Sequence, residues 1–484
     1  MTKILKKIAI VSLILLTLSC SFAPKYQRPA IVIPEHYKEE HTWKKVSPHA
    51  AEVSQGEWWK IFGDETLNQL ETEADFHNQT LKASFARYKE SRAVANATRA
   101  AYFPNISTIF NADRQHISGT TSTNSAPAYS SDFYLGVDVS YEVDLWGRVK
   151  NAVISNDNLA KAALADFSAV QLNLQANLAA NYFALRGADA VQRVLNATTN
   201  AYQHVLNLIE VRHKDGIATA GDVQQAISAL ENVKTISSDN QLRRSQLEHA
   251  IAVLVGKLPA EFSLPPAIVK MHSVYPFREL PSKLLERRPD IAAAERRVIA
   301  ANAQIGVAQA AFFPNVNLES DAGFESALIS RLVELPSLFW ALGPATTLVL
   351  TKPLANLILF DGGYLKAKLD QANATYYETV ANYRQTVLAA FQEVEDNLAA
   401  MRQLKKENIS QNAATIAAYK SLVQSIDRYK GGVATYLDIF VTQNAALQYE
   451  LTAVNIATRR QIANVQLIKA LGGNWELGDE NSYT

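Results

Sequence analysis

Two long segments of the chain carry apolar side chains at helical spacing. In the later segment these side chains are Val380, Tyr383, Val387, Phe391, Val394, Leu398 and Met401. They are separated by 3, 4, 4, 3, 4 and 3 positions, and an average near ~3.5 is the period of a coiled coil. The earlier segment, with separations of 3, 4, 4, 4 and 3, carries Phe167, Val170, Leu174, Leu178, Tyr182 and Leu185. Both segments are therefore predicted to be helices that pack sideways against other helices.

The predicted helices are unusually long. Residues 148–212 contain no proline and one glycine, Gly187, and residues 364–430 contain neither residue type. A helix of about 60 residues is ~90 Å long, whereas the mean helix has about 11–12 residues. Such a helix needs lateral packing along its whole length. A shorter helix is predicted over residues 64–102, because Pro104 follows and a proline disfavours helical geometry in the residue before it.

Strands are predicted where apolar and polar residues alternate. From Phe133 to Val143 every second residue is apolar, and the residues between them are polar or small. A period of two places the two kinds on opposite faces of a strand. The predicted strands cover residues 105–114, 133–144, 316–324 and, interrupted by Pro353, 346–359. A polar loop is predicted over residues 117–131.

The chain contains one internal duplication with a period of 210–216 residues. Residues 100–106 (AAYFPNI) return as residues 310–316 (AAFFPNV), and residues 213–223 (HKDGIATAGDV) return as residues 429–439 (YKGGVATYLDI). Further matches relate residues 144–148 to residues 359–363, and Val255-Gly256 to Leu471-Gly472. Four landmarks in the same order indicate two copies of one unit. Each copy is predicted as a helix, two strands, a very long helix, a tight turn and a long helix.

The duplication predicts how membrane strands could be arranged. Two copies give four strands per chain, and a four-stranded sheet keeps two open edges, which lipid does not tolerate. No segment after the N-terminal run has 18 uninterrupted apolar residues, so a membrane crossing would have to use strands. Membrane barrels close with eight or more strands. The predicted fold class is mainly α with a transmembrane β portion: a homotrimer with a long α-helical barrel and a 12-stranded β-barrel, four strands per protomer.

The N-terminus has the regions of a signal peptide. Residues 1–7 are basic, residues 8–18 form an apolar run, and Ser19 precedes Cys20, the only cysteine. The run is much shorter than the ~20 residues of a spanning helix. The site resembles a lipoprotein cleavage site, which makes Cys20 the predicted lipidation residue, although Thr17 stands where such sites typically have leucine. An ordinary secreted protein with a cysteine in its signal peptide is the alternative.

These observations predict six parts of the chain. They are a signal peptide (1–19), a lipid-anchored extended segment (20–62), the first repeat (63–257), a linker (258–288), the second repeat (289–473) and a C-terminal tail (474–484).

The composition argues against several classes of function. Lys and Arg total 47, as do Asp and Glu, so nothing indicates a nucleic-acid partner. The nine histidines show no His-Glu-x-x-His pattern, and the chain has no Gly-rich phosphate loop and no Gly-x-Ser-x-Gly. The chain is therefore predicted not to be an enzyme and to need no cofactor and no metal. Two other classes stay open: a periplasmic lipoprotein hydrolase, for which no catalytic group is visible, and a coiled-coil adaptor outside the membrane, against which the alternating strands argue.

The two tight turns carry the same residues in the same order. These residues are Gly216, Thr219 and Asp222 in the first turn, and Gly432, Thr435 and Asp438 in the second. The glycines suit the left-handed cap that ends a helix, and the threonines can cap the helix that follows. The aspartates lie in its first turn, where the helix dipole favours a carboxylate. This structural role is sufficient by itself, and a functional role stays open beside it.

Several motifs resemble those of the TolC-type outer-membrane efflux proteins, and within them the NodT-like lipoproteins. The most specific is residues 287–295 (RRPDIAAAE). The others are residues 23–29 (APKYQRP), Trp58-Trp59, residues 141–148 (YEVDLWGR), the two Phe-Pro-Asn turns and the two Gly-x-x-Thr turns. The resemblance implies an exit channel in the outer membrane, in contact with its lipid and with its helices in the periplasm. Its partners would be a periplasmic adaptor protein and an inner-membrane pump of the resistance–nodulation–division type.

The resemblance also implies roles for the turns, which would form the closed periplasmic end. The residues that would contact the adaptor are Gly216, Thr219, Gly432 and Thr435. Asp438 matches an aspartate that forms a cation-binding ring at the constriction, and Val441 stands where the family has a second one. The gate candidates are Asp438, Asp222, Arg428, Tyr429, Lys430 and Arg212, of which the last four are candidates for the links that hold the end shut.

Overall fold

The computed structural model describes residues 23–31, 37–40, 57–118, 128–268, 287–344 and 360–473. The chain forms two compact units. The sheet unit comprises Met1–Ala30, Arg87–Ala163 and Ala293–Arg384. The hairpin unit comprises Ile31–Ala86, Leu164–Ala292 and Gln385–Thr484. Each unit therefore draws on both halves of the predicted duplication.

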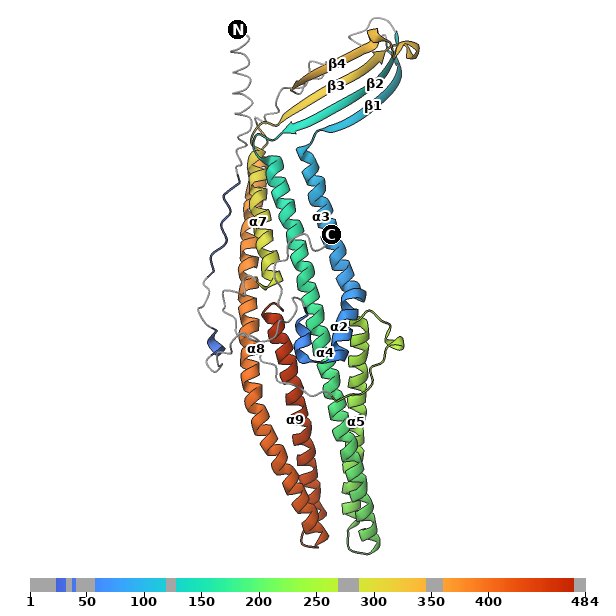
Figure 1. Ribbon diagram of the computed structural model, residues 1–484, viewed down its shortest axis with the longest axis vertical. Helices are drawn as coiled ribbons and strands as arrows, with labels where there is room; N and C mark the ends of the chain where they lie inside the picture. Colours follow the sequence, from blue (N-terminus) through green and yellow to red (C-terminus); the bar gives the residue numbers. More distant parts are fainter. Residues whose placement is uncertain are drawn as a thin grey trace. The chain divides into compact units, whose positions relative to one another are not determined.

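Four long helices form two helical hairpins, α4 with α5 and α8 with α9 (Figure 1). Helices α4 (Arg148–Lys214) and α8 (Tyr364–Lys430) have 67 residues each, which confirms both predicted long helices. Helices α5 (Ala220–Leu254) and α9 (Tyr436–Ala470) have 35 residues each, and the equal lengths agree with the predicted duplication. A 67-residue helix measures ~100 Å. None of the helices in the described ranges has the length and apolar character that a bilayer crossing requires.

Most of the predicted apolar series is buried. The buried members are Phe167, Leu174, Leu178, Tyr182 and Leu185 on α4, and Val380, Tyr383, Val387, Val394 and Met401 on α8. In the hairpin unit the α4 residues share a core with Trp58, Trp59 and Phe62, which form the short helix η2 (Trp58–Phe62). This burial is the lateral packing that helices of such length need.

The single helix predicted over residues 64–102 is two helices, α2 (Glu65–His77) and α3 (Gln79–Arg99), followed by a 3-10 turn, η3 (Ala100–Tyr102). The break lies at Asn78, which has an extended backbone. Its side-chain oxygen accepts a hydrogen bond from the Leu81 N–H at 2.9 Å and so caps α3. A side-chain amide that competes with the backbone in this way favours a new helix start over a continuous helix.

The sheet unit contains one antiparallel sheet in the order β1-β2-β3-β4. Its strands are β1 (Asn105–Ile117), β2 (Ala128–Val143), β3 (Val316–Ser326) and β4 (Leu338–Pro344). The first three confirm the predicted strands, but β1 and β2 extend into the predicted polar loop. Strand β4 precedes the predicted fourth strand, whose residues, 346–359, lie outside the described residues. In the described part of the chain, β1 and β4 are the edge strands.

The register gives the sheet one apolar and one polar face. Leu135 pairs with Phe110 and with Phe324, and Phe324 pairs with Leu338, so these apolar residues share a face. Many side chains of this face are exposed, including Ile106, Phe110, Leu135, Val137, Trp340 and Leu342. The opposite face carries Asp138 directly across from Asp321, beside Ser107. The predicted alternation is therefore confirmed, and it leaves a contiguous apolar surface that needs a cover of lipid or protein.

A tight bend leads from β2 into α4. Gly147 has a φ of +73°, a left-handed conformation that favours glycine. The indole N–H of Trp146 donates to the Pro314 carbonyl at 2.9 Å, and its ring stacks on Phe313 with 4.9 Å between the centroids. The guanidinium of Arg148 is paired with both carboxylate oxygens of Glu142. These contacts fix the start of the long helix against the strand that precedes it.

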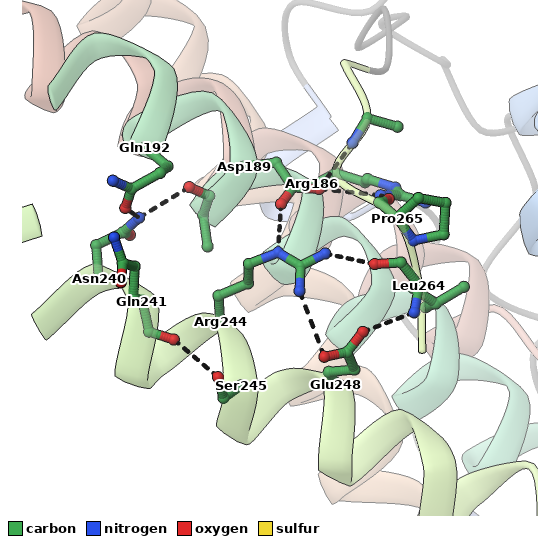
Figure 2. Close-up of polar contacts among 12 residues, drawn as sticks. Arg186, Asp189, Gln192, Asn240, Gln241, Arg244, Ser245, Glu248, Leu264 and Pro265 are labelled. Carbon is green, nitrogen blue, oxygen red and sulfur yellow. Dashed lines mark hydrogen bonds and ion pairs between the residues drawn. The ribbon is translucent and has the colours of Figure 1, made fainter. Parts of the chain in front are cut away.

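A buried ionic network holds the segment that follows α5, residues 262–268, here called the strap (Figure 2). The side chains of Arg186 and Asp189 are 2% exposed, and Nη1 of Arg186 donates to the Asp189 carboxylate and to the Pro265 carbonyl at 2.9 Å each. Arg244 donates to Asp189 at 2.7 Å and to the Leu264 carbonyl at 2.5 Å. The network therefore ties α4, α5 and the strap together through two cations and their carboxylates.

The carboxylates of the network also accept backbone N–H groups of the strap. Glu248 accepts the Leu264 N–H at 2.6 Å, and Asp189 accepts the Ala267 N–H at 3.1 Å. A segment without regular secondary structure cannot satisfy its own backbone groups. Here the helices satisfy them instead.

A second buried acid, Glu71 on α2, has no such partners. Its side chain is fully buried, and neither carboxylate oxygen has a hydrogen-bond partner among the described residues. Burial, together with the nearby charge of Asp75, raises the pKa of Glu71 well above its usual value. The folded chain therefore keeps this carboxylic acid neutral to a higher pH than the unfolded chain does.

We expect this acid to make stability depend on pH. Above about pH 4.3, the ordinary glutamate pKa, the unfolded chain loses the Glu71 proton while the folded chain retains it. Stability then falls as pH rises, until the raised pKa of the folded state is reached. Glu71→Gln should flatten this slope when the denaturant midpoint is measured from pH 4 to pH 8. The exposed Glu90→Gln on α3 is the control, and an equal slope in Glu71→Gln and the unsubstituted chain would contradict the prediction.

Candidate functional site

The turn between α4 and α5 is a capped helix end followed directly by a capped helix start. Gly216 has a φ of +74°, and its N–H donates to the His213 carbonyl at 3.0 Å. The Ile217 N–H donates to the Arg212 carbonyl at 2.8 Å, which completes a Schellman motif. Asp222 accepts the N–H of Thr219 at 2.9 Å and returns its own N–H to the Thr219 hydroxyl at 3.2 Å. This is the capping predicted from the sequence.

The turn between α8 and α9 repeats this geometry. Gly432 has a φ of +76°, and the Val433 N–H donates to the Arg428 carbonyl at 3.0 Å. The Asp438 carboxylate accepts the N–H of Thr435 at 2.9 Å and its hydroxyl at 3.0 Å. Both turns are therefore fixed by local hydrogen bonds within about ten residues of chain.

The bonds from Thr435 keep Asp438 charged. The backbone N–H and the hydroxyl of Thr435 lower the pKa of Asp438 below its usual value, and the positive charge of Arg428 acts in the same direction. A lowered pKa means that the carboxylate is ionised throughout the physiological range. Asp438 therefore supplies a permanent negative charge at the turn. Val441, one helical turn further along α9, is exposed and apolar.

Arg212 joins the two hairpins near their turns. Its Nη1 donates to the Tyr429 carbonyl at 3.0 Å, and its Nη2 lies 3.3 Å from the Lys430 carbonyl. The guanidinium also lies 4.5 Å from the centroid of the Tyr429 ring, a cation–π distance. The last carbonyls of a helix lack partners within the helix and carry its negative dipole end. Arg212 therefore satisfies the C-terminal end of α8 from α4.

The gate candidates thus take different parts in this arrangement. Arg212 supplies the side-chain link, whereas Tyr429 and Lys430 contribute backbone carbonyls and, in Tyr429, a buried ring. Arg428 is exposed and acts on Asp438 through its charge. Asp222 caps α5.

An aromatic cluster behind the turns was not predicted. Tyr436 is buried, and its ring centroid lies 6.4 Å from that of Tyr429 and 6.5 Å from that of Phe440. Burial raises the pKa of Tyr436 to about 12, so its hydroxyl stays neutral. Tyr202 on α4 belongs to the same apolar cluster. Tyr436 could have been found from its place between the capping residue Thr435 and the core residue Ile439, but no local signal marks Tyr202.

Each turn also presents one apolar side chain outward. Ile217 and Val433 directly follow the left-handed glycines, and each is 70% exposed. Among the described residues no group of three or more His, Cys, Asp or Glu side chains could hold a metal ion. The predicted lipidation residue, Cys20, lies outside the described residues.

Comparison with known proteins agrees with this architecture. A family model described as outer membrane efflux protein matches residues 72–257 and 280–473. The outer membrane protein OprJ of Pseudomonas aeruginosa is 31% identical over 96% of this chain and 95% of its own length. The toluene efflux pump outer membrane protein TtgF of Pseudomonas putida is 30% identical over 94% of both chains.

The fold is also that of a solved outer-membrane channel. The outer-membrane channel OprN superposes with a TM-score of 0.86 and 27% identity, over 94% of this chain and 99% of the channel. These findings confirm the resemblance drawn from the sequence motifs. The chain belongs to the outer membrane efflux protein family and is an efflux channel protein of the outer membrane.

Proposed function

We propose that three copies of this chain assemble into a passive exit duct for small molecules. The four-stranded sheet is the observation that carries the proposal. It exposes apolar side chains on one face, and β1 and β4 are its edges in the described part of the chain. In lipid, both edges need a partner strand. Three such sheets placed edge to edge would supply twelve strands, which is enough to close around a lumen.

The polar face of the sheet would then line the lumen. This face carries Asp138 and Asp321 in direct cross-strand register. Like charges placed opposite each other are unfavourable unless they are hydrated. A water-filled lumen would supply that hydration, whereas an interface with lipid or an apolar core would not.

In this proposal the duct is one part of a tripartite system. A periplasmic adaptor protein connects it to an inner-membrane pump of the resistance–nodulation–division type, which supplies the energy and selects the cargo. The chain itself catalyses no reaction. Acylated Cys20 anchors each copy to the outer membrane, and the helical part lies in the periplasm. The exposed Ile217 and Val433 give the adaptor an apolar contact on each turn.

The turns form the gated periplasmic end of the proposed duct. Support comes from Arg212, which ties the end of α8 to α4. Asp438 adds a permanent negative charge, so three copies would place a ring of carboxylates around the axis. Because Val441 stands one turn further along, the ring would have one carboxylate per copy.

Conductance in planar bilayers tests both the duct and its gate. The purified chain should form channels, and Asp438→Ala combined with Arg428→Ser should raise their single-channel conductance, because the charges that hold the closed end are removed. Arg212→Ala should act in the same direction. The control is Glu231→Ala with Lys234→Ser, which removes an exposed ion pair of α5 away from the turns. An unchanged conductance in all tip variants would reject the gate, and a lack of channels would reject the duct.

A further inference from the structure

The most specific sequence motif, residues 287–295, opens helix α7 (Pro289–Ala310) and has no part in the turns. Its Arg288 is largely buried, with 9% of the side chain exposed. Two guanidinium nitrogens donate to the carboxylate of Asp290, at 3.0 and 2.6 Å. The third, Nη1, donates to Glu393 on α8 at 2.7 Å and to the Ala470 carbonyl, the last residue of α9, at 3.2 Å.

Arg288 therefore joins α7, α8 and α9 at one point, through residues that all belong to the hairpin unit. It lies at the C-terminal end of α9, where the unpaired carbonyls favour a positive charge. Its bond to Glu393 fixes the position of α8 beside this end of α9. A buried charge is stable only with such partners, so its position is strongly constrained.

The first half of the chain has a matching joint, a contact between the start of one helix and the end of a long helix, but without a charged side chain. Asn78 opens α3, and its amide donates to the Leu254 carbonyl, the last residue of α5, at 2.9 Å. Both joints also bring backbone close to a left-handed glycine. A Cβ on Gly256 would lie 2.6 Å from the His77 carbonyl oxygen, and one on Gly472 would lie 2.4 Å from that of Arg287. The common geometry makes Asn78 an internal control for Arg288, with the same contact and without the charge.

Glu393 and the turn lie far apart along α8, so a small change in the tilt of α8 at Glu393 moves the turn by a much larger amount. Glu393 lies 36 residues before Tyr429, which is ~54 Å along a helix. Over that distance a tilt of about 3° displaces the helix end by ~3 Å. The bond from Arg212 to the Tyr429 carbonyl is 3.0 Å long, and such a bond is lost beyond about 3.5 Å. The bond from Arg212 to α8 therefore depends on the tilt of α8.

We propose that Arg288 is a positioning residue for the gate: through Glu393 it sets the tilt of α8 that brings the Tyr429 carbonyl within reach of Arg212. The inference rests on the proposed gate at the turns. The inference gives residues 287–291 (RRPDI) a role in the gate, although they lie far from the turn. Arg288 does not itself line the closed end.

Single-channel conductance of full-length protein in planar bilayers tests this role. Glu393→Ala removes the acceptor on α8 while Arg288 keeps Asp290, so the variant should fold. Its conductance should rise in the same direction as that of Arg212→Ala. The double variant Glu393→Ala with Arg212→Ala should show a fold-increase smaller than the product of the two single increases, because both changes release the same contact. Arg288→Lys, which keeps a point charge but loses the two-pronged contact, should lie between Glu393→Ala and the unsubstituted chain.

Asn78→Ala is the matched control, measured with the thermal unfolding of every variant. It should lower the unfolding midpoint and leave the conductance unchanged. If Glu393→Ala and Arg288→Lys lower the midpoint but conduct like the unsubstituted chain while Arg212→Ala conducts more, Arg288 is only structural and the inference is overturned. An equal rise in Asn78→Ala would overturn it too, since general loosening would then be the cause. If Arg212→Ala itself has no effect, the proposed gate fails first.

Discussion

Asp189→Ala is expected to lower the free energy of unfolding by about 3–5 kcal/mol, the usual cost of removing one partner from a buried ion pair. Arg186 and Arg244 both donate to this carboxylate, at 2.9 and 2.7 Å. The side chain of Arg186 is 2% exposed, so its guanidinium cannot become hydrated when the Asp189 carboxylate is removed. The Ala267 N–H of the strap loses its acceptor as well. The loss should therefore exceed that of an ordinary surface ion pair several-fold.

Denaturant unfolding of the detergent-solubilised protein measures this loss. Asp239→Ala, at an exposed position on α5, is the matched control and should change the stability by less than about 0.5 kcal/mol. Asp189→Asn should cost less than Asp189→Ala, because an amide can still accept one of the hydrogen bonds. Equal stabilities of Asp189→Ala and the control would contradict a supporting role of the network for the strap.

Gly187→Leu is expected to have a comparably large effect, from steric overlap instead of lost charge pairing. Gly187 is the single glycine of α4, and a Cβ at this position would lie 2.4 Å from the hydroxyl oxygen and 2.7 Å from the methyl carbon of Thr458 on α9. The Thr458 hydroxyl is bonded to the Val454 carbonyl at 2.9 Å, so rotating it away loses a bond. Overpacking by a few carbon atoms costs about 1–3 kcal/mol, and leucine adds four, so the loss should reach the upper part of that range or exceed it.

A double-mutant cycle separates overlap from helix propensity. Gly187→Ala gains up to about 1 kcal/mol of helix propensity, yet it should destabilise, because the overlap begins at the Cβ. Combining it with Thr458→Ala should recover part of the loss, since the two nearest atoms are then absent. Gly221→Ala in the first turn of α5 is the control of opposite sign, because its nearest neighbour is 3.5 Å away. Additive effects of Gly187→Ala and Thr458→Ala would show that α4 and α9 do not approach each other here.

Local periodicity was sufficient to predict the long helices and the first three strands, and the glycine, threonine and aspartate residues were sufficient to predict both turns. Helix length follows from the absence of proline and the continuity of apolar spacing, as in residues 364–430. The break at Asn78 could not be predicted in the same way. The cap from Asn78 to Leu81 is local, but the Asn78 amide also donates to the carbonyl of Leu254, 176 residues away, and an asparagine can reach that carbonyl only in the folded chain. Strand β4 lies in a segment without clear alternation, and its pairing with β3 determines its position.

In the candidate site, too, local contacts could be predicted from the sequence and distant contacts could not. Gly216, Gly432 and the Thr–Asp pairs act within a few residues of each other, and so their sequence order predicts their geometry. Arg212 was identified as a possible link, but its partner could not be, because it bonds to backbone carbonyls 217 and 218 positions later. Every residue has a backbone carbonyl, so the sequence does not show which one accepts such a bond. The ionic network around Asp189 was missed for a related reason, since the strap contributes backbone groups only.

Each turn closes through its glycine, its threonine–aspartate pair and main-chain bonds, none of which involves the side chain of Ile217 or Val433. The side chains at these two positions can therefore change without loss of these bonds, provided that the main-chain N–H is kept. If the periplasmic partner does rest on them, lineages could exchange one partner for another by substitutions at a pair of surface sites, while the architecture that conducts solutes stays intact.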